Sequence, residues 1–296
     1  MNNRKLHQKS VESFLNNQFS SSPWEFTNPE GYGNETYFAW RGKNVFFVKL
    51  GSHVARYQVI ASIGLTPTIL SNGFLEDGTS IMVQKYIDGR TPTRRDYQTH
   101  LKDFTTAIKK VHHNPQIKQT LPEVSTDQFS TIGLQVLDKI QTRWEEFKSL
   151  VPGTSDLVDE GIAQLRENVK KFRGDGLVAS HNDICNSNWI ITPDDKLYLI
   201  DLDSMSIDDP ALDIGATLWW YYPPEMRQEF LEIFGYADDN EFKTRMQVRM
   251  AMHCLNIILP RKNSFDSFDP EAFSENLTDF KAIIAGEENP QGYFDL

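Results

Sequence analysis

In the first third of the chain, hydrophobic and polar residues alternate over short runs, as they do in the strands of a half-buried sheet. The runs occupy residues 24–27, 36–40, 45–51, 67–75 and 80–87. Turn sequences such as RGKN and EDGT separate them, whereas residues 53–63 have the apolar spacing of a short helix that ends at Gly64. An amphipathic segment precedes the first run. We therefore predict an antiparallel sheet with a leading helix and one inserted helix in residues 1–86.

Beyond residue 86 the apolar residues recur every three or four positions, which is the spacing of helices that bury one face. Stripes of this kind run through residues 97–111, 129–150, 158–172, 241–259 and 273–284. They are interrupted by a buried extended run, GLVAS, and by a two-stranded hairpin, WII and LYLI around the turn TPDDK. The predicted fold class is therefore α+β, with a small β-rich N-terminal lobe (1–86) and a larger, mainly helical C-terminal lobe (87–296).

Composition is that of an ordinary globular protein and narrows the choice of partners. Of the 296 residues 39% are hydrophobic, and no apolar run approaches the roughly 20 residues of a membrane span. The N-terminus lacks the apolar centre of a signal peptide, and Cys185 and Cys254 cannot form a disulfide framework, so we expect a cytoplasmic protein without a membrane partner. The net charge of −11 disfavours nucleic acid and favours a cationic ligand, although it also serves solubility. Nothing in the sequence bears on oligomeric state.

The candidate chemistry lies in the segment HNDICNSN and in the hairpin that follows it. Asp183 and Asn188 are five residues apart, and the hairpin delivers Asp201 at the end of its second strand. One carboxylate can accept the proton of a hydroxyl group, while an amide oxygen and a second carboxylate can hold Mg²⁺. A single Asp or Asn in a loop is more often a turn residue or a helix cap. The spacing of the whole set favours phosphoryl transfer.

Lys49 and a glycine-containing turn are the candidate phosphate contacts. Lys49 lies in the apolar strand VFFVKL, where a cation needs a negative partner such as the phosphates of a nucleotide. A solvated edge strand is the alternative environment for this lysine. Gly31 and Gly33 lie in a turn that can fold over phosphates, because no Cβ shields their backbone N–H groups. The alternative is that these two glycines only form a turn.

Taken together, these segments resemble the aminoglycoside phosphotransferase and choline kinase family, small-molecule kinases with a protein-kinase-like two-lobed fold. HNDICNSN is similar to the catalytic loop of that family, YLIDLDSMSIDDPALDIGA to its metal-binding segment, and QKYIDGRT to its hinge. The resemblance extends over nearly the whole chain and is most specific over residues 181–213. It implies an ATP- and Mg²⁺-dependent phosphotransferase that acts on a hydroxyl group of a small molecule.

The resemblance also implies roles for the charged residues of the site. Asp183 would be the catalytic carboxylate that accepts the proton of the acceptor hydroxyl. Asn188 and Asp201 would be the ligands of Mg²⁺, and Lys49 would hold the α- and β-phosphates of ATP.

Further roles follow from the resemblance for residues around this set. The backbone at Lys85 and Ile87 would bind the adenine ring. His181 and Asp213 would brace the catalytic loop. Asp203 would be either a further metal or substrate contact or a supporting residue.

The sequence after the metal-binding carboxylate departs from the protein-kinase pattern. In protein kinases the metal-binding Asp is followed by Phe-Gly and by an activation loop that ends in A-P-E. Here Asp201 is followed by Leu202 and Asp203, and no A-P-E follows. This difference argues against a protein substrate and favours a small acceptor.

A second departure concerns the partner of Lys49. The helix after this lysine normally supplies a glutamate that pairs with it, but no Asp or Glu occurs between Lys49 and Glu76. We expect Gln58, or an acid elsewhere such as Glu35, to take its place. The missing glutamate also motivates an alternative function, a nucleotide-binding protein of the kinase fold with weak or no transferase activity.

Two features bear on the acceptor without identifying it. The aromatic run Trp219–Tyr222 follows the metal-binding segment, and its rings either belong to the core or contact a cationic or sugar-like ligand. Residues 261–296 hold three basic and eight acidic residues, 3 − 8 = −5. This acidic tail is either a solvated face or an attraction for a cationic acceptor.

Overall fold

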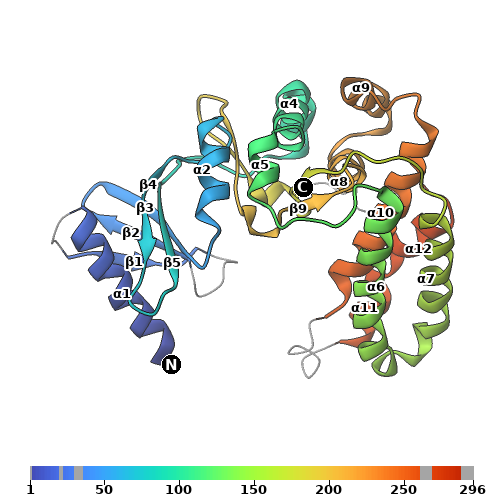
Figure 1. The fold of residues 1–296 in the computed structure, drawn as a ribbon, viewed down its shortest axis with the longest axis horizontal. Helices are drawn as coiled ribbons and strands as arrows, with labels where there is room; N and C mark the ends of the chain where they lie inside the picture. The colour runs from blue at the N-terminus through green and yellow to red at the C-terminus, as the bar shows by residue number, and fades with distance from the viewer. Residues whose placement is uncertain (1, 20–22, 30–35, 261–268, 288–296) are drawn as a thin grey trace. The chain divides into compact units, whose positions relative to one another are not determined.

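The structure is a computed structural model that describes residues 2–19, 23–29, 36–260 and 269–287. The chain folds into two compact units (Figure 1). The first unit combines residues 1–91 with 187–204, and the second combines residues 92–186 with 205–296. Among the described residues, none of the helices has the length and apolar character that crossing a membrane requires.

The first unit is built on the antiparallel sheet that the alternating runs predict. Its strands are β1 (Glu25–Thr27), β2 (Thr36–Arg41), β3 (Asn44–Leu50), β4 (Ile69–Phe74) and β5 (Ser80–Lys85). They pair in the order β1-β2-β3-β5-β4, and every pair is antiparallel. The five predicted strands are thus confirmed, and β3 lies in the interior of the sheet.

The two faces of this sheet differ because successive side chains of a strand point to opposite sides. Val48 and Leu50 of β3 are buried in an apolar cluster. The leading helix α1 (Asn2–Gln18) contributes Val11 and Leu15 to the same cluster, so α1 covers this face (Figure 1). Lys49 alternates with these residues and therefore points to the other face.

The hairpin of strands β7 (Trp189–Ile191) and β8 (Leu197–Leu199) belongs to the first unit, together with the helix α2 (Val54–Ser62). The backbone of Ile191 exchanges two hydrogen bonds with that of Arg90 (2.8 and 3.0 Å). The N–H of Leu199 donates to the carbonyl of Leu65 just after α2 (2.6 Å). These backbone contacts hold the hairpin in the first unit, although 103 residues (86–188) lie between β5 and β7 along the chain.

The second unit is mainly helical, as the three- and four-residue periodicity predicts. Its elements are α3 (Arg94–Thr99), α4 (Leu101–His112), α5 (Pro115–Gln119), α6 (Phe129–Phe147), α7 (Ser155–Val169), β6 (Val178–Ser180), β9 (Ser206–Asp208), α8 (Ala211–Tyr221), α9 (Pro224–Phe234), α10 (Asn240–Ile258), α11 (Pro270–Asn276) and α12 (Thr278–Ile284). The helix α10 contacts α6, α7, α8 and α12 and is the centre of the core. The predicted α+β class is confirmed.

A few local features differ from the prediction. The stripe over residues 97–111 is divided between α3 and α4 at His100, whose backbone (φ −107°, ψ 32°) leaves the helical conformation. Thr93 and Asp96 form the capping box at which α3 begins. The extended run before His181 pairs with β9 as a two-stranded ladder. β9 has only three residues, too few for an alternating pattern to be recognised.

Candidate functional site

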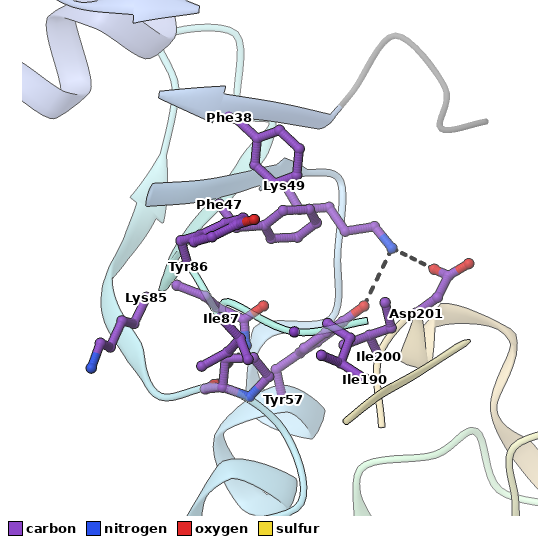
Figure 2. Close-up of a pocket in the computed structure, with 13 residues that line it drawn as sticks. Phe38, Phe47, Lys49, Tyr57, Lys85, Tyr86, Ile87, Ile190, Ile200 and Asp201 are labelled. Atoms are coloured by element: carbon purple, nitrogen blue, oxygen red, sulfur yellow. Dashed lines mark hydrogen bonds and ion pairs between the residues drawn. The ribbon is translucent and has the colours of Figure 1, made fainter. Parts of the chain in front are cut away.

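A pocket of about 210 Å³ lies inside the first unit (Figure 2). Phe38 and Phe47 of the sheet form part of its wall, and Ile190 and Ile200 of the hairpin form another part. It is further lined by Lys49, Tyr57, Pro67, Gln84, Lys85, Tyr86, Ile87, Gly89 and Asp201. The pocket is therefore an apolar slot with Lys49 and Asp201 at one end and the segment after β5 at the other (Figure 2).

Lys49 is a largely buried cation at the polar end of this pocket. Its side chain is 12% exposed, and its Nζ lies 2.6 Å from Asp201 Oδ1 and 2.5 Å from Asp203 Oδ2. Because β3 is paired on both sides, the alternative of a solvated edge strand is wrong. The two carboxylates are the negative partners that a lysine in an apolar strand requires.

The hairpin geometry brings Asn188 and Asp201 to the same end. Trp189 faces Leu199 in the register of β7 and β8, and one step further the N–H of Ile200 donates to the carbonyl of Asn188 (2.9 Å). Asn188 is 5% exposed, whereas the side chain of Asp201 is 36% exposed. Asp201 has a left-handed backbone (φ 54°), a conformation that a non-glycine residue rarely adopts and that turns the chain sharply after β8.

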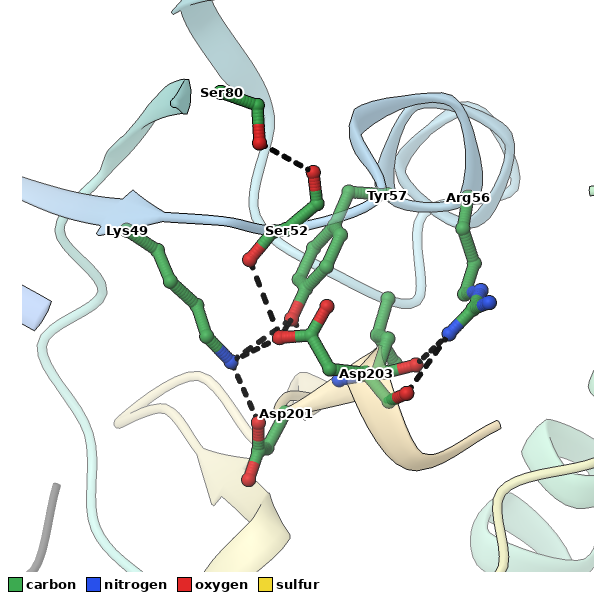
Figure 3. A network of polar contacts seen from close by, with 8 residues as sticks. Lys49, Ser52, Arg56, Tyr57, Ser80, Asp201 and Asp203 are labelled. Carbon is green, nitrogen blue, oxygen red and sulfur yellow. Dashed lines mark hydrogen bonds and ion pairs between the residues drawn. The ribbon is translucent and has the colours of Figure 1, made fainter. Parts of the chain in front are cut away.

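Tyr57 on α2 is a site residue that the sequence analysis missed (Figure 3). Its hydroxyl accepts from Lys49 Nζ (3.3 Å) and from the N–H of Leu202 (3.0 Å), and it donates to Asp203 Oδ2 (3.3 Å). Gln58, the expected partner of the lysine, is exposed. Glu35, the other expected partner, lies outside the described residues.

A signal for Tyr57 is present in the sequence, but it is weak. Tyr57 and Ile60 are both buried and lie three residues apart, so they share the inward face of α2. A tyrosine on such a face brings a polar tip into the interior. A phenol carries no charge at neutral pH, so a tyrosine after Lys49 does not stand out as an ionic partner of the lysine.

Burial and neighbouring charges shift the pKa values of both Lys49 and Tyr57. Burial alone would lower the pKa of Lys49, but Tyr57, Asp201 and Asp203 outweigh burial, and the pKa is raised. Burial raises the pKa of Tyr57, and the neighbouring Lys49 opposes this shift only in part. At neutral pH the lysine is therefore a cation and the tyrosine a neutral hydroxyl.

The same helix also binds the backbone that follows Asp201. Arg56 is 1% exposed, and its Nη1 donates to the carbonyls of Leu202 (2.6 Å) and Asp203 (3.2 Å). Burial lowers the pKa of Arg56, against the effect of Asp203. Arg56 and Tyr57 together hold both polar groups of the Leu202 backbone, so α2 fixes the turn that presents Asp201.

Asp183 is exposed and lies in the second unit, at the end of a well-supported loop. The buried carboxylate of Asp213 accepts from the N–H groups of His181 (2.7 Å) and Asn182 (2.9 Å) and contacts Nε2 of His112 (2.9 Å). Burial raises the pKa of Asp213, but His112 and the backbone donors outweigh it and the pKa is lowered. The expected bracing of the loop by Asp213 is confirmed.

The remaining candidates divide between the core and the undescribed part of the chain. Trp219, Tyr221 and Tyr222 are buried in the second unit, which confirms the core alternative for these three rings. Trp220 is half-buried and packs against His253 in a tilted arrangement, with 5.4 Å between ring centroids. Gly31 and Gly33 lie outside the described residues, as do 261–268 and 288–296 of the acidic tail.

Comparison with known proteins supports the chemistry that this geometry suggests. The family model described as "Phosphotransferase enzyme family" matches residues 27–247. The match spans the sheet, the hairpin and most of the helical unit. The resemblance inferred from the sequence is thereby confirmed.

Solved structures with the same fold include three small-molecule kinases. Choline kinase LicA from Streptococcus pneumoniae has 16% identity, a TM-score of 0.61, and coverage of 92% of this chain and 99% of its own. Spectinomycin phosphotransferase APH(9)-Ia in complex with ADP and spectinomycin has 15% identity, a TM-score of 0.62, and coverage of 94% and 97%. Plasmodium vivax ethanolamine kinase has 14% identity, a TM-score of 0.64, and coverage of 96% and 89%. These likenesses confirm the protein-kinase-like fold.

Proposed function

Because the chain belongs to the phosphotransferase enzyme family, we propose that it transfers the γ-phosphate of ATP to a hydroxyl group of a small molecule in the presence of Mg²⁺. The observation that carries this proposal is the pairing of Lys49 with Asp201 at the end of the apolar pocket. A buried cation beside a partly exposed carboxylate provides a contact for phosphate and a ligand for a metal at one place.

The pocket suits a purine nucleotide. Phe38 and Phe47 on one side and Ile190 and Ile200 on the other leave an apolar slot for a flat ring. The backbone at Lys85 and Ile87, which also line the slot, would bind the adenine edge. Lys49 would hold the α- and β-phosphates, and the turn with Gly31 and Gly33 would cover them. The spectinomycin phosphotransferase with the same fold was crystallised with ADP.

Asn188 and Asp201 are the proposed ligands of Mg²⁺, and their donor set fits this ion. Mg²⁺ takes oxygen ligands and is commonly held by one or two protein groups together with substrate phosphates. The hairpin brings one amide and one carboxylate to the same end, and the carboxylate is open to solvent. The ion would neutralise charge on the phosphates during transfer.

Asp183 is the proposed catalytic carboxylate. It would orient the acceptor hydroxyl and accept its proton as the bond to phosphorus forms. The loop before it is held in one conformation by Asp213, so the carboxylate is presented from a fixed backbone. The acceptor is a small molecule with a hydroxyl group, and the charge of −11 favours a cationic one. In this proposal residues 1–86 form the nucleotide-binding lobe and residues 87–296 carry the catalytic loop and the acceptor site.

A substrate panel tests the proposal. Phosphate transfer from ATP would be measured with amino sugars, choline, ethanolamine and amino alcohols, with and without Mg²⁺. We expect Mg²⁺-dependent transfer to at least one of them, and a loss of roughly 10²–10⁴-fold in kcat for Asp183→Asn. Asp238→Asn, which changes an exposed acid of the same unit, is the matched control. Nucleotide binding without transfer to any acceptor would favour the alternative of a nucleotide-binding protein.

A further inference from the structure

The helix α2 contacts Lys49 through a neutral hydroxyl instead of a carboxylate. The part of α2 that faces Lys49 is Tyr57, whose hydroxyl lies 3.3 Å from the lysine Nζ. The ammonium lies 5.9 Å from the centre of the tyrosine ring, beyond the hydroxyl and not over the ring face. Tyr57 therefore contacts the lysine through its hydroxyl oxygen.

Every hydrogen-bonding site of the Tyr57 hydroxyl has a partner in this position. A phenol has one O–H donor and two acceptor sites. It donates to Asp203, and it accepts from Lys49 and from the backbone N–H of Leu202. Tyr57 is 2% exposed, so its ring cannot turn away without leaving buried groups unpaired. The direction in which the hydroxyl oxygen faces Lys49 is therefore fixed.

Asp203 is held in the same way from a second side. Its Oδ2 accepts from Ser52 Oγ (3.2 Å), and the hydroxyl of Ser80 donates to the carbonyl of Ser52 (3.0 Å), as Figure 3 shows. Lys49, Tyr57 and Asp203 thus meet within one network whose other members are fixed. If Asp201 binds a metal, as proposed above, Tyr57 and Asp203 are the contacts that still orient the lysine.

We propose that Tyr57 is the positioning residue for Lys49, so that a tyrosine on α2 fulfils the role of the absent acid. This inference rests on the proposed function, because it concerns the grip of Lys49 on the phosphates of a nucleotide. Tyr57 does not touch the phosphates in this scheme. It acts only by directing the lysine toward them.

The test separates binding of phosphate from binding of the base. Dissociation constants of ADP and of adenosine would be measured calorimetrically, with Mg²⁺, for the wild type, Tyr57→Phe and the control Tyr236→Phe. We expect Tyr57→Phe to weaken ADP binding roughly three- to tenfold, the range for one ordinary hydrogen bond, and to leave adenosine binding within about twofold. Tyr236→Phe removes the same hydroxyl from the second unit and should change neither constant.

A double-mutant cycle with Lys49→Met shows whether the tyrosine acts through the lysine. We expect Tyr57→Phe to have no further effect on ADP binding in the Lys49→Met background. The inference is overturned if Tyr57→Phe binds ADP like the wild type, if it weakens adenosine as much as ADP, or if its effect persists without Lys49. Failure of the wild type to bind ADP would instead overturn the proposed function itself. Adenosine binding by the variant also reports that its pocket has folded.

Discussion

Asp213 shows how one buried carboxylate can position a residue that it does not touch. Its two oxygens accept the N–H groups of His181 and Asn182, and Oδ2 also contacts His112. The backbone of Asn182 has a positive φ of 65°, which is tolerated here because its own amide and the preceding one have a fixed acceptor. Asp183 is the next residue, so Asp213 fixes the backbone from which the Asp183 side chain extends.

Replacement of this carboxylate by an amide should therefore destabilise the protein. Asp213→Asn leaves only one acceptor oxygen, so at least one buried N–H loses its partner, which costs about 1–3 kcal/mol. We expect a free energy of unfolding lower by that amount in a urea titration. The exposed Asp238→Asn should unfold like the wild type. Equal unfolding free energies for all three proteins would show that Asp213 does not stabilise the loop.

His253 on α10 provides a residue-scale test at acid pH. The pKa of His253 is lowered to about 4, because burial, with a smaller effect of Arg249, outweighs the opposing effects of Asp183 and Asp213. In the unfolded chain a histidine has a pKa of about 6.5. The folded state therefore binds fewer protons than the unfolded state between these values, so stability is complete above pH 6.5 and falls as the pH drops toward 4.

We expect His253→Gln to remove this part of the acid sensitivity. Protonation of His253 should lower the unfolding free energy of the wild type by roughly 1–3 kcal/mol between pH 7 and pH 4.5. The variant lacks this histidine, so its unfolding free energy should fall by roughly 1–3 kcal/mol less over the same range. His53→Gln changes an exposed histidine and is the control. Parallel pH profiles for the wild type and His253→Gln would contradict the lowered pKa.

At the residue scale, the sequence was informative where a local pattern decides the environment. Lys49 could be predicted as a largely buried cation because its strand is apolar on both sides. Asp201 could be predicted as a site residue because the alternating pattern of the hairpin ends just before it. Tyr57 could not be predicted, because its role depends on a backbone amide 145 positions away. Such a contact arises only when α2 and the hairpin pack together.

At the scale of elements, the hairpin depends on a close approach to the segment after β5. A Cβ at Gly89 would lie 2.5 Å from Ile190 Cγ2 and 2.7 Å from the carbonyl oxygen of Ile191. The second of these atoms belongs to backbone that is already hydrogen-bonded to Arg90, so it cannot yield easily. Only glycine permits this packing.

Gly89→Ala should therefore disturb both the hairpin and the pocket. Overpacking of this kind costs roughly 1–3 kcal/mol, so the variant should melt at a lower temperature and bind adenosine more weakly. Gly153→Ala is the matched control, because a Cβ at Gly153 meets nothing within 4 Å and its φ is not positive. An unchanged melting temperature and adenosine affinity in Gly89→Ala would show that the hairpin can move aside.

Element types were predictable from periodicity, whereas the breaks between elements were not. The sheet runs and the long helical stripes follow from spacings of two and of three to four residues. The division of the 97–111 stripe at His100 is a change of backbone conformation at one residue (φ −107°, ψ 32°), which the spacing of apolar residues does not record. The division of the last helix at Leu277, between α11 and α12, leaves the apolar stripe unbroken and so gives no periodic signal.

At the scale of the whole molecule, the chain order and the spatial units do not coincide. Residues 187–204 belong to the first unit, although the chain on either side of them belongs to the second. Of the residues that the structure describes, those that line the pocket all belong to the first unit, and the hairpin supplies part of its wall. A nucleotide in this pocket would therefore contact two stretches of sequence that are far apart along the chain.

This arrangement predicts where a nucleotide protects the protein against hydrogen exchange. A ligand that binds only the folded pocket raises the opening free energy of the structure around it. We expect ADP with Mg²⁺ to slow exchange in residues 36–91 and in the hairpin 187–204, and to leave the helices α6 and α7 unchanged. Adenosine should protect the same slot with a smaller effect near Lys49, because it has no phosphate for the ammonium. Lys49→Met should remove the difference between the two ligands, while equal protection in both units would show that the nucleotide does not act through this pocket alone.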